Sequence, residues 1–162
     1  MLEAARDVLL KFLGALLPKL LGWFYKQERI ANDIKIRPNG EGDAITVIAG
    51  ELPNIQIWLL ATNLSPFTIE IDRLLVQVQH GAVIGEFCSV RKTQLKPATE
   101  ALLKVESALS AHQTVGFFKY HTQSSYSMLY ITAYINCGVH NLQIVRNVQV
   151  ANTRMLGVPS AA

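Results

Sequence analysis

Residues 63–87 contain two runs in which apolar and polar side chains alternate, and no other pattern in the chain limits its fold as strongly. The first run follows the turn signal Asn63-Leu64-Ser65-Pro66, and His80-Gly81 separates it from the second. The apolar positions of the first run are Ile69, Ile71, Leu74, Val76 and Val78. Alternation with a period of two predicts strands, and a short glycine turn between two such strands predicts a β-hairpin.

Further strands are predicted on both sides of this hairpin. The hydrophobic period changes from 3.6 to two near Ile34, and more strand-like runs lie at 33–38, 44–52, 54–63, 127–136 and 142–152. Residues 95–107 contain a Pro-bounded loop and another strand. Short strands separated by turn signals are typical of a two-sheet sandwich. The predicted fold is therefore mostly β: an antiparallel immunoglobulin- or fibronectin-III-like sandwich of about seven strands, with one short helix.

That short helix is expected at residues 107–123, where the alternation stops. Ser110 is a suitable N-cap, because its hydroxyl can accept a hydrogen bond from the first turn. Gly116 weakens a helix by about 1 kcal/mol relative to alanine. We expect the helix to cross one end of the sandwich.

The first thirty residues have a different character. On a helical wheel the charged residues lie on one side, and the apolar arc is wider than packing on a single core requires. The predicted membrane anchor consists of Leu9, Phe12, Leu13, Leu16, Leu17, Leu20, Trp23 and Phe24, with Lys11 and Lys19 facing water. Three interpretations stay open: an interfacial helix, a short span whose lysines snorkel, and a helix docked on protein.

The predicted organisation follows from these patterns. Residues 1–30 form an amphipathic, membrane-associating helix, residues 31–156 the β-sandwich, and residues 157–162 a flexible tail. If the first segment spans a bilayer, Lys26 and Arg29 flank its C-terminal end. The positive-inside rule then places the large domain on the cytoplasmic side.

The hairpin resembles the WHy family, the second group of late embryogenesis abundant proteins. The matching residues are Ile55, Ile57, Asn63, Pro66, Phe67, Ile69, Ile71, Leu74, Gly81, Ile84 and Gly85. Many relatives have adjacent Asn-Pro, whereas Leu64-Ser65 stands between Asn63 and Pro66 here. The resemblance covers residues 32–156. It implies a β-sandwich, and either lipid binding or transfer, or protection under desiccation-type stress.

Composition excludes some classes of function. Half of the chain is apolar, 17% is charged and the formal net charge is +3, with the basic residues scattered. This composition disfavours nucleic acid as a partner and leaves a mild preference for anionic lipid.

Cys88 and Cys137 are expected to be buried free thiols, although a disulfide between them stays open. The four histidines are His80, His112, His121 and His140, and none has metal-ligand spacing.

No nucleophile, phosphate or cofactor motif occurs, so the sequence predicts a non-enzymatic protein without a cofactor. Late aromatic residues suggest an apolar groove that takes a lipid tail, the alternative being ordinary core packing. The predicted groove consists of Phe117, Phe118, Tyr120 and Tyr130. The leading functional hypothesis is a membrane-associated sandwich that binds an apolar ligand or a partner protein. The alternative is a structural subunit or homo-oligomer whose N-terminal helix packs on other chains.

Overall fold

The chain is mostly β, as expected. A computed structural model describes residues 24–157, apart from the side chains of residues 145–147. The described elements are α2 (Gln27–Asp33), β1 (Ile34–Pro38), β2 (Ile45–Ile48), β3 (Asn54–Asn63), β4 (Ile69–His80), β5 (Val83–Ser89), β6 (Thr93–Leu95), β7 (Thr99–Ala108), α3 (Ala111–His121), β8 (Tyr126–Asn136) and β9 (Asn141–Leu156).

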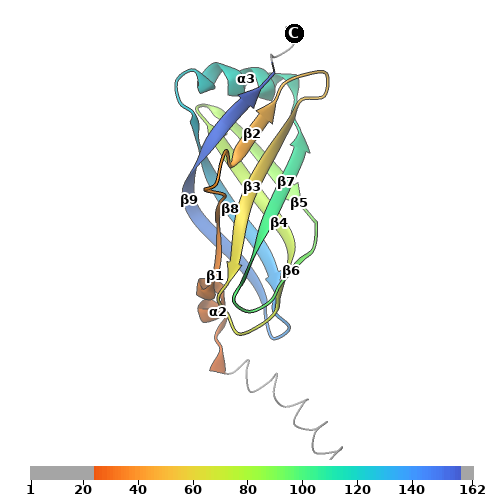
Figure 1. Cartoon of the computed structure of the whole chain (residues 1–162), viewed down its shortest axis with the longest axis vertical. Helices are drawn as coiled ribbons and strands as arrows, with labels where there is room; N and C mark the ends of the chain where they lie inside the picture. The colour runs from red at the N-terminus through yellow and green to blue at the C-terminus, as the bar shows by residue number, and fades with distance from the viewer. Residues whose placement is uncertain (1–23, 158–162) are drawn as a thin grey trace, which may run out of the picture.

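The strands form two layers (Figure 1). In one layer, β1 and β2 share one edge of β3 and β7 occupies the other edge. In the second layer, β5 and β6 share one edge of β4, and β8 occupies the other. All of these pairings are antiparallel.

Strand β9 joins the two layers. Its residues 141–152 pair with β8, whereas Thr153–Leu156 pair in parallel with β2. The result is one continuous mixed sheet with the order β1-β3-β2-β9-β8-β4-β5, with β7 on β3 and β6 on β4. The predicted immunoglobulin-like sandwich of about seven antiparallel strands is therefore wrong in detail. Nine strands are described, and the one parallel pairing follows from the length of β9.

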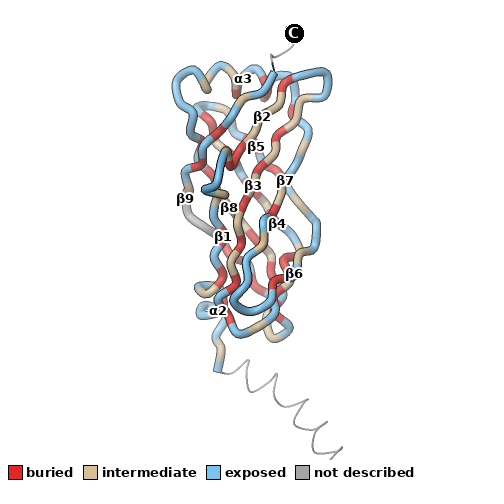
Figure 2. The backbone as a smooth tube through the Cα atoms, viewed as in Figure 1, coloured by how far each residue is buried: buried red, intermediate tan, exposed pale blue. Residues whose placement is uncertain are grey.

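The core lies between the layers, and buried residues alternate with exposed ones along the strands (Figure 2). In β3 the odd-numbered residues from Ile55 to Ala61 are buried. In β4 the buried residues are at odd-numbered positions up to Ile71, and at even-numbered positions from Leu74 onward. An irregularity in the β4–β8 pairing between Ile71 and Arg73 causes this change, because an extra residue in a strand reverses the facing of every later side chain.

Helix α3 covers one end of the sandwich (Figure 1). The predicted cap at Ser110 is confirmed. The Ser110 hydroxyl accepts a hydrogen bond from the Gln113 amide at 3.2 Å, and the Gln113 side chain accepts one from the Ser110 amide at 3.0 Å. A Cβ at Gly116 would lie 2.5 Å from a Val83 methyl group, so the glycine lets the helix approach β5 closely.

The β4–β5 turn differs slightly from the prediction. The connecting residues are Gly81 and Ala82, and His80 is the last residue of β4, fully buried and paired with Val83. Gly81 has φ +60°, and a Cβ there would lie within 2.8 Å of three Tyr120 atoms. Glycine therefore serves both the left-handed backbone and the packing of α3 on the turn.

The corner between β3 and β4 is held together by Asn63. Its buried amide nitrogen donates to the carbonyls of Phe67 at 2.7 Å and Leu95 at 3.1 Å. Its side-chain oxygen accepts from the amide of Ser65 at 3.0 Å and from the Ser65 hydroxyl at 2.7 Å. The inserted Leu64-Ser65 thus completes a hydrogen-bonded corner rather than disturbing it.

We expect Asn63→Ala to lower the free energy of unfolding by about 3 kcal/mol, because it removes four hydrogen bonds from a buried corner. Urea unfolding followed by circular dichroism measures this. Asn32→Ala, which removes an exposed asparagine from α2, is the matched control and should change stability by less than about 0.5 kcal/mol. Equal effects of the two substitutions would contradict the assignment.

Candidate functional site

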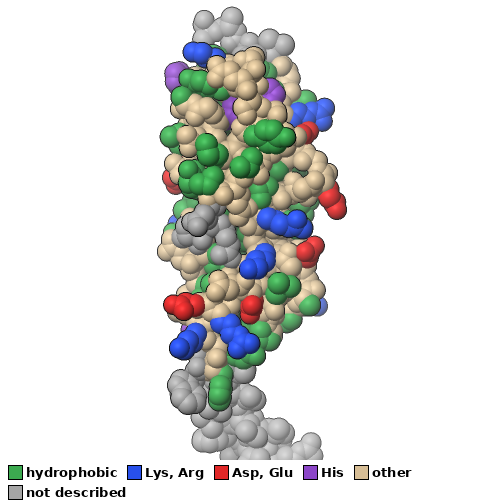
Figure 3. Space-filling model, turned by 90° about the vertical axis from the view of Figure 1, so that its left-hand side faces the viewer, with side chains coloured by type: hydrophobic (Ala, Val, Ile, Leu, Met, Phe, Trp, Pro, Cys, Tyr) green, Lys and Arg blue, Asp and Glu red, His purple; other side chains and the backbone are tan. Residues whose placement is uncertain are grey.

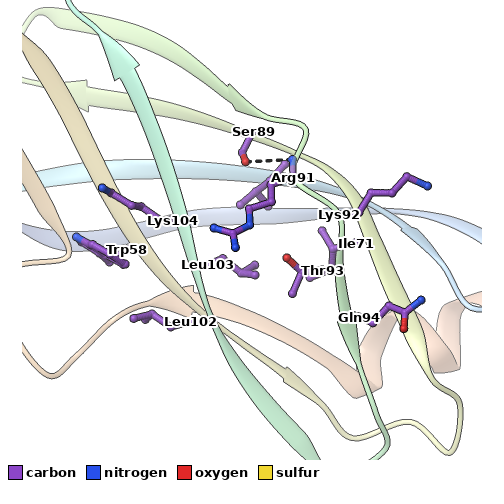
Figure 4. A pocket seen from close by; sticks show the side chains of 11 residues that line it. Trp58, Ile71, Ser89, Arg91, Lys92, Thr93, Gln94, Leu102, Leu103 and Lys104 are labelled. Atoms are coloured by element: carbon purple, nitrogen blue, oxygen red, sulfur yellow. Dashed lines mark hydrogen bonds between the residues drawn. The ribbon is translucent and has the colours of Figure 1, made fainter.

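A hollow lies where the two free edges of the continuous sheet approach each other, between β7 and the segment that connects β5 to β6 (Figure 4). We call it the side hollow. Its volume is about 420 Å³, and its lining residues are Trp58, Ile71, Leu74, Ser89, Arg91, Lys92, Thr93, Gln94, Leu102, Leu103 and Lys104. This volume falls within the usual range for small-molecule sites.

The floor of the side hollow is apolar. Ile71, Leu74 and Leu103 are buried members of the core. Trp58 and Leu102 add apolar surface at the outer margin. A ligand chain in this hollow would therefore contact aliphatic side chains that are continuous with the sandwich interior.

The rim of the side hollow is basic. Three of its lining residues are Arg or Lys and none is Asp or Glu. Lys92 is already paired, with its ammonium group 2.9 Å from Glu70 and 3.1 Å from Asp72, and it points away from the hollow in Figure 4. The hydrogen bond from Lys92 lowers the pKa of Glu70, and the same contact raises the pKa of Lys92.

Lys104 is also occupied. Its ammonium group lies 2.7 Å from the Glu106 carboxylate and 5.2 Å from the centre of the Trp58 ring, a cation–π arrangement. Glu106 additionally accepts a hydrogen bond from Gln56 at 3.0 Å. The bonds from Lys104 and Gln56 lower the pKa of Glu106, so this carboxylate stays charged at neutral pH.

Arg91 differs from its two neighbours. Figure 4 shows its guanidinium group directed into the gap toward β7. None of the ion pairs within residues 24–157 includes it. The hydrogen bond recorded for Arg91 within the described part of the chain is a long one of 3.5 Å from its backbone amide to the Ser89 hydroxyl. Arg91 is thus the cation of the side hollow that has no acidic partner among the described residues.

The sequence patterns missed this site. Trp58, Arg91 and Leu103 lie on three segments, and only the pairing of β7 with β3 and the folding of the sheet bring them together. The tandem Arg91-Lys92 after a strand was the one available signal.

The predicted aromatic groove is not assembled in the structure. Phe117 is fully buried in the core, Phe118 packs against the core, and Tyr130 lies on the exposed face of β8. Tyr120 alone lines a hollow, one of about 540 Å³ between α3 and β5. Consecutive residues of a helix point in different directions, so Phe117 and Phe118 of α3 face different neighbours, and Tyr130 belongs to β8 rather than to the helix.

Two of the four histidines, His80 and His121, lie beside each other, and His80 takes part in a buried chain of polar groups. His80 shares a 2.8 Å hydrogen bond with the Ser127 hydroxyl, which in turn shares one of 2.6 Å with Thr153. The His80 ring stacks on Phe117 at 5.6 Å and on His121 at 5.8 Å. His80, Ser127 and Thr153 are all buried, so this chain of polar groups is structural. Within residues 24–157, no three His, Cys, Asp or Glu side chains gather in a way that could hold a metal ion.

The two cysteines are separate thiols. Cys137 is buried, as expected, and its sulfur donates to the His140 carbonyl at 3.2 Å. Cys88 is exposed, contrary to the prediction, because alternation along β5 turns it away from the core while Phe87 points inward.

Most of the predicted anchor lies outside the described residues. This holds for Leu9 to Trp23 with Lys11 and Lys19, whereas Phe24 is described and is 67% exposed. Between residues 24 and 157 there is no helix with the length and hydropathy needed to cross a bilayer.

The segment that follows the anchor is firmly attached to the sandwich. The Tyr25 ring meets Phe67 edge-on at 5.1 Å, and His140 shares a 3.0 Å hydrogen bond with the Tyr25 carbonyl. Ile30 of α2 is fully buried in the core. Helix α2 therefore runs across the predicted domain boundary after residue 30 and packs as part of the sandwich.

Comparisons with known proteins show the fold and no more. No family model matches the sequence, and no curated protein matches it. A structural genomics target of known structure has a TM-score of 0.50 at 9% identity, over 75% of this chain and 88% of that one. A protein from Archaeoglobus fulgidus gives 0.45 at 15% identity, over 76% and 97% of the two chains. A protein provisionally described as late embryogenesis abundant gives 0.48 at 10% identity, over 94% and 89%.

The buried His80 predicts that stability depends on pH. Burial, helped by repulsion from His121, lowers the pKa of His80 below its ordinary 6.5. The unfolded chain then takes up a proton that the native state resists, so stability present above about pH 6.5 is lost as the pH falls below it. We expect the melting temperature to drop between about pH 7.5 and pH 5.5.

The His80→Gln variant tests this pH dependence. It should be less stable at pH 7.5 but show a smaller drop, measured by differential scanning fluorimetry. The exposed His112 on α3 supplies the control, and His112→Gln should keep the full drop. An unchanged drop in His80→Gln would show that another group controls it.

Proposed function

We propose that this protein is a non-enzymatic, membrane-associated β-sandwich of the WHy type that binds an apolar ligand. The observation that carries the proposal is the attachment of α2 to the sandwich directly after the amphipathic segment. A segment held in the headgroup region would then fix the sandwich at a set orientation instead of tethering it loosely.

The end of the molecule that contains α2 has features that suit a membrane surface. We call it the α2 pole: residues 24–33, the corner 63–68 and the turn 96–98. Leu64 belongs to this end because its amide donates to the Asp33 carbonyl at 2.8 Å, and Ala98 because its amide donates to the Asn63 carbonyl at 2.8 Å. The exposed side chains of this pole include the apolar Phe24 and Leu64, the basic Lys26, Arg29 and Lys96, and the acidic Glu28. The apolar and basic side chains favour contact with acyl boundaries and anionic headgroups.

The described residues support a ligand-binding function better than a catalytic one. The side hollow has an aliphatic floor, which is the usual lining of a ligand site. The pair with the geometry of a base and a nucleophile, His80 and Ser127, is sealed in the core, where no substrate would reach it. If residues 8–25 span the bilayer, we propose in addition that the large domain lies on the cytoplasmic side of the membrane.

Full-length protein should float with vesicles that contain phosphatidylserine in a sucrose gradient. We expect Leu13→Glu/Leu16→Glu to reduce the floating fraction at least about tenfold, because each buried leucine contributes roughly 1.5–3 kcal/mol. Leu52→Glu, in the exposed β2–β3 loop, is the control and should float like the wild type. Undiminished flotation of the double variant would refute the membrane assignment.

A second candidate function is supported by an exposed apolar surface. We call it the β8–β9 patch, and its members are Tyr126, Met128, Tyr130, Val148 and Val150. Met128 and Val150 are cross-strand partners, so the two strands present one continuous surface. Figure 3, which views the molecule from the β9 side, shows hydrophobic side chains gathered in its upper half.

This surface suits an assembly module. The predicted amphipathic segment of residues 1–30 has a wide apolar arc, which is stabilised when another apolar surface covers it. The β8–β9 patch supplies such a surface. In this alternative, the segment of one copy packs on the patch of another, and the protein forms a soluble homo-oligomer.

Size-exclusion chromatography with light scattering, without detergent, separates the two candidates. The assembly alternative predicts a defined oligomer that both Leu16→Glu and Met128→Lys convert to monomer, whereas Leu52→Lys leaves it intact. A wild-type monomer, or an oligomer that persists in Met128→Lys, would count against this alternative.

A further inference from the structure

We infer that the side hollow is a binding site for an anionic amphiphile, with the acidic headgroup on Arg91 and a single apolar chain along the aliphatic floor. The inference rests on the proposed function for the apolar nature of the ligand. It adds the location of the site, the charge of the headgroup and the residue that selects it.

The expected charge of the headgroup depends on which basic residues at the rim already have acidic partners. Lys92 and Lys104 each have a carboxylate partner within 2.9 Å. Arg91 has no such partner among the described residues, and the hollow into which it points is lined by no Asp or Glu. Arg91 is exposed, so an anion can reach it, and its unpaired charge beside an apolar floor attracts the acidic headgroup of a ligand whose chain lies on that floor.

The chemistry of arginine narrows the headgroup further. Its planar guanidinium group presents paired N–H donors that match the oxygens of a carboxylate or a phosphate. Thr93 and Ser89 line the same rim and offer hydroxyl groups, whereas the Gln94 amide nitrogen already donates to Glu70 at 3.2 Å. A fatty-acid carboxylate and a lipid phosphate share this recognition, and the two headgroups can be compared directly.

The apolar floor of the side hollow indicates that the ligand carries an apolar chain. Leu103 lies inward on β7, and Ile71 and Leu74 lie opposite it on β4. The two layers meet here without a strand ladder between β5 and β7, so the chain would lie between free edges. Trp58, beside Lys104 on the outer margin, is close enough to report on the occupant.

Tryptophan fluorescence provides the test. The chain has two tryptophans, Trp23 and Trp58, so full-length Trp23→Phe leaves Trp58 as the sole reporter. It is titrated below micelle-forming concentrations with dodecanoate, dodecyl phosphate and dodecyltrimethylammonium, which share one chain and differ in the headgroup. We expect at least one of the two anions to bind about tenfold tighter than the cation.

Variants assign that preference to Arg91. Arg91→Gln should weaken binding of the preferred anion about tenfold and leave the cation unchanged, whereas Arg91→Lys should retain part of the preference. Arg37→Gln removes an exposed arginine of β1 that does not line the side hollow, and it should bind like the parent. Equal affinity for all three headgroups, or an anion preference that survives in Arg91→Gln, would overturn the inference.

The same titration in Leu13→Glu/Leu16→Glu keeps the two proposals apart. Binding that depends on Arg91 should persist there, because every lining residue named for the side hollow belongs to the sandwich. If the double variant no longer floats with vesicles but still binds the anion, the binding site is supported and separate from the membrane segment. If the wild type floats but Arg91→Gln does not change anion binding, the binding site is rejected and the membrane assignment remains.

Discussion

Hydrogen bonds from β9 to both layers are the constraint on which the rest of the structure depends. The strand pairs with β8 along most of its length and with β2 at its end, so the two layers are joined on one side by continuous backbone hydrogen bonding. The sheet then has to end elsewhere, at β7 in one layer and at β5 in the other. Those two edges approach each other without pairing, and the side hollow lies between them. The location of the candidate site is thus a consequence of where the sheet is continuous.

A second constraint acts at the α2 pole. The corner at Asn63 uses every polar atom of its amide, and it positions Phe67 against Tyr25. The same corner therefore shapes the end of the core and receives the segment that leads in from the N-terminus. Because Ile30 is buried as well, motion of α2 relative to the sandwich would require breaking core contacts. This coupling is why the proposed function includes a set orientation at the membrane.

Much of the fold could be predicted from local pattern. Alternation identified the residues of β3, β4 and β5, and a side-chain cap identified the start of α3 at Ser110. The apolar positions Ile69, Ile71 and Leu74 already contained the change of facing in β4 that the irregularity after Ile71 produces. The short strand β6, which comes before the Pro97 loop and pairs with β4, was missed. The site was missed as well, since Arg91 becomes distinctive only when its neighbours prove to be paired.

The sequence by itself determined the β-rich class, the position of the hairpin, the capped helix and the amphipathic character of the first thirty residues. Each of these depends on interactions between residues close in the chain, or on a periodicity that every strand or helix imposes locally. Only the tertiary structure decided that β9 lies beside β2 in parallel, that His80 is buried and that Arg91 faces an apolar hollow. These three features depend on which segments, distant in the sequence, form hydrogen bonds with each other and exclude water together. A local sequence pattern does not specify those partners.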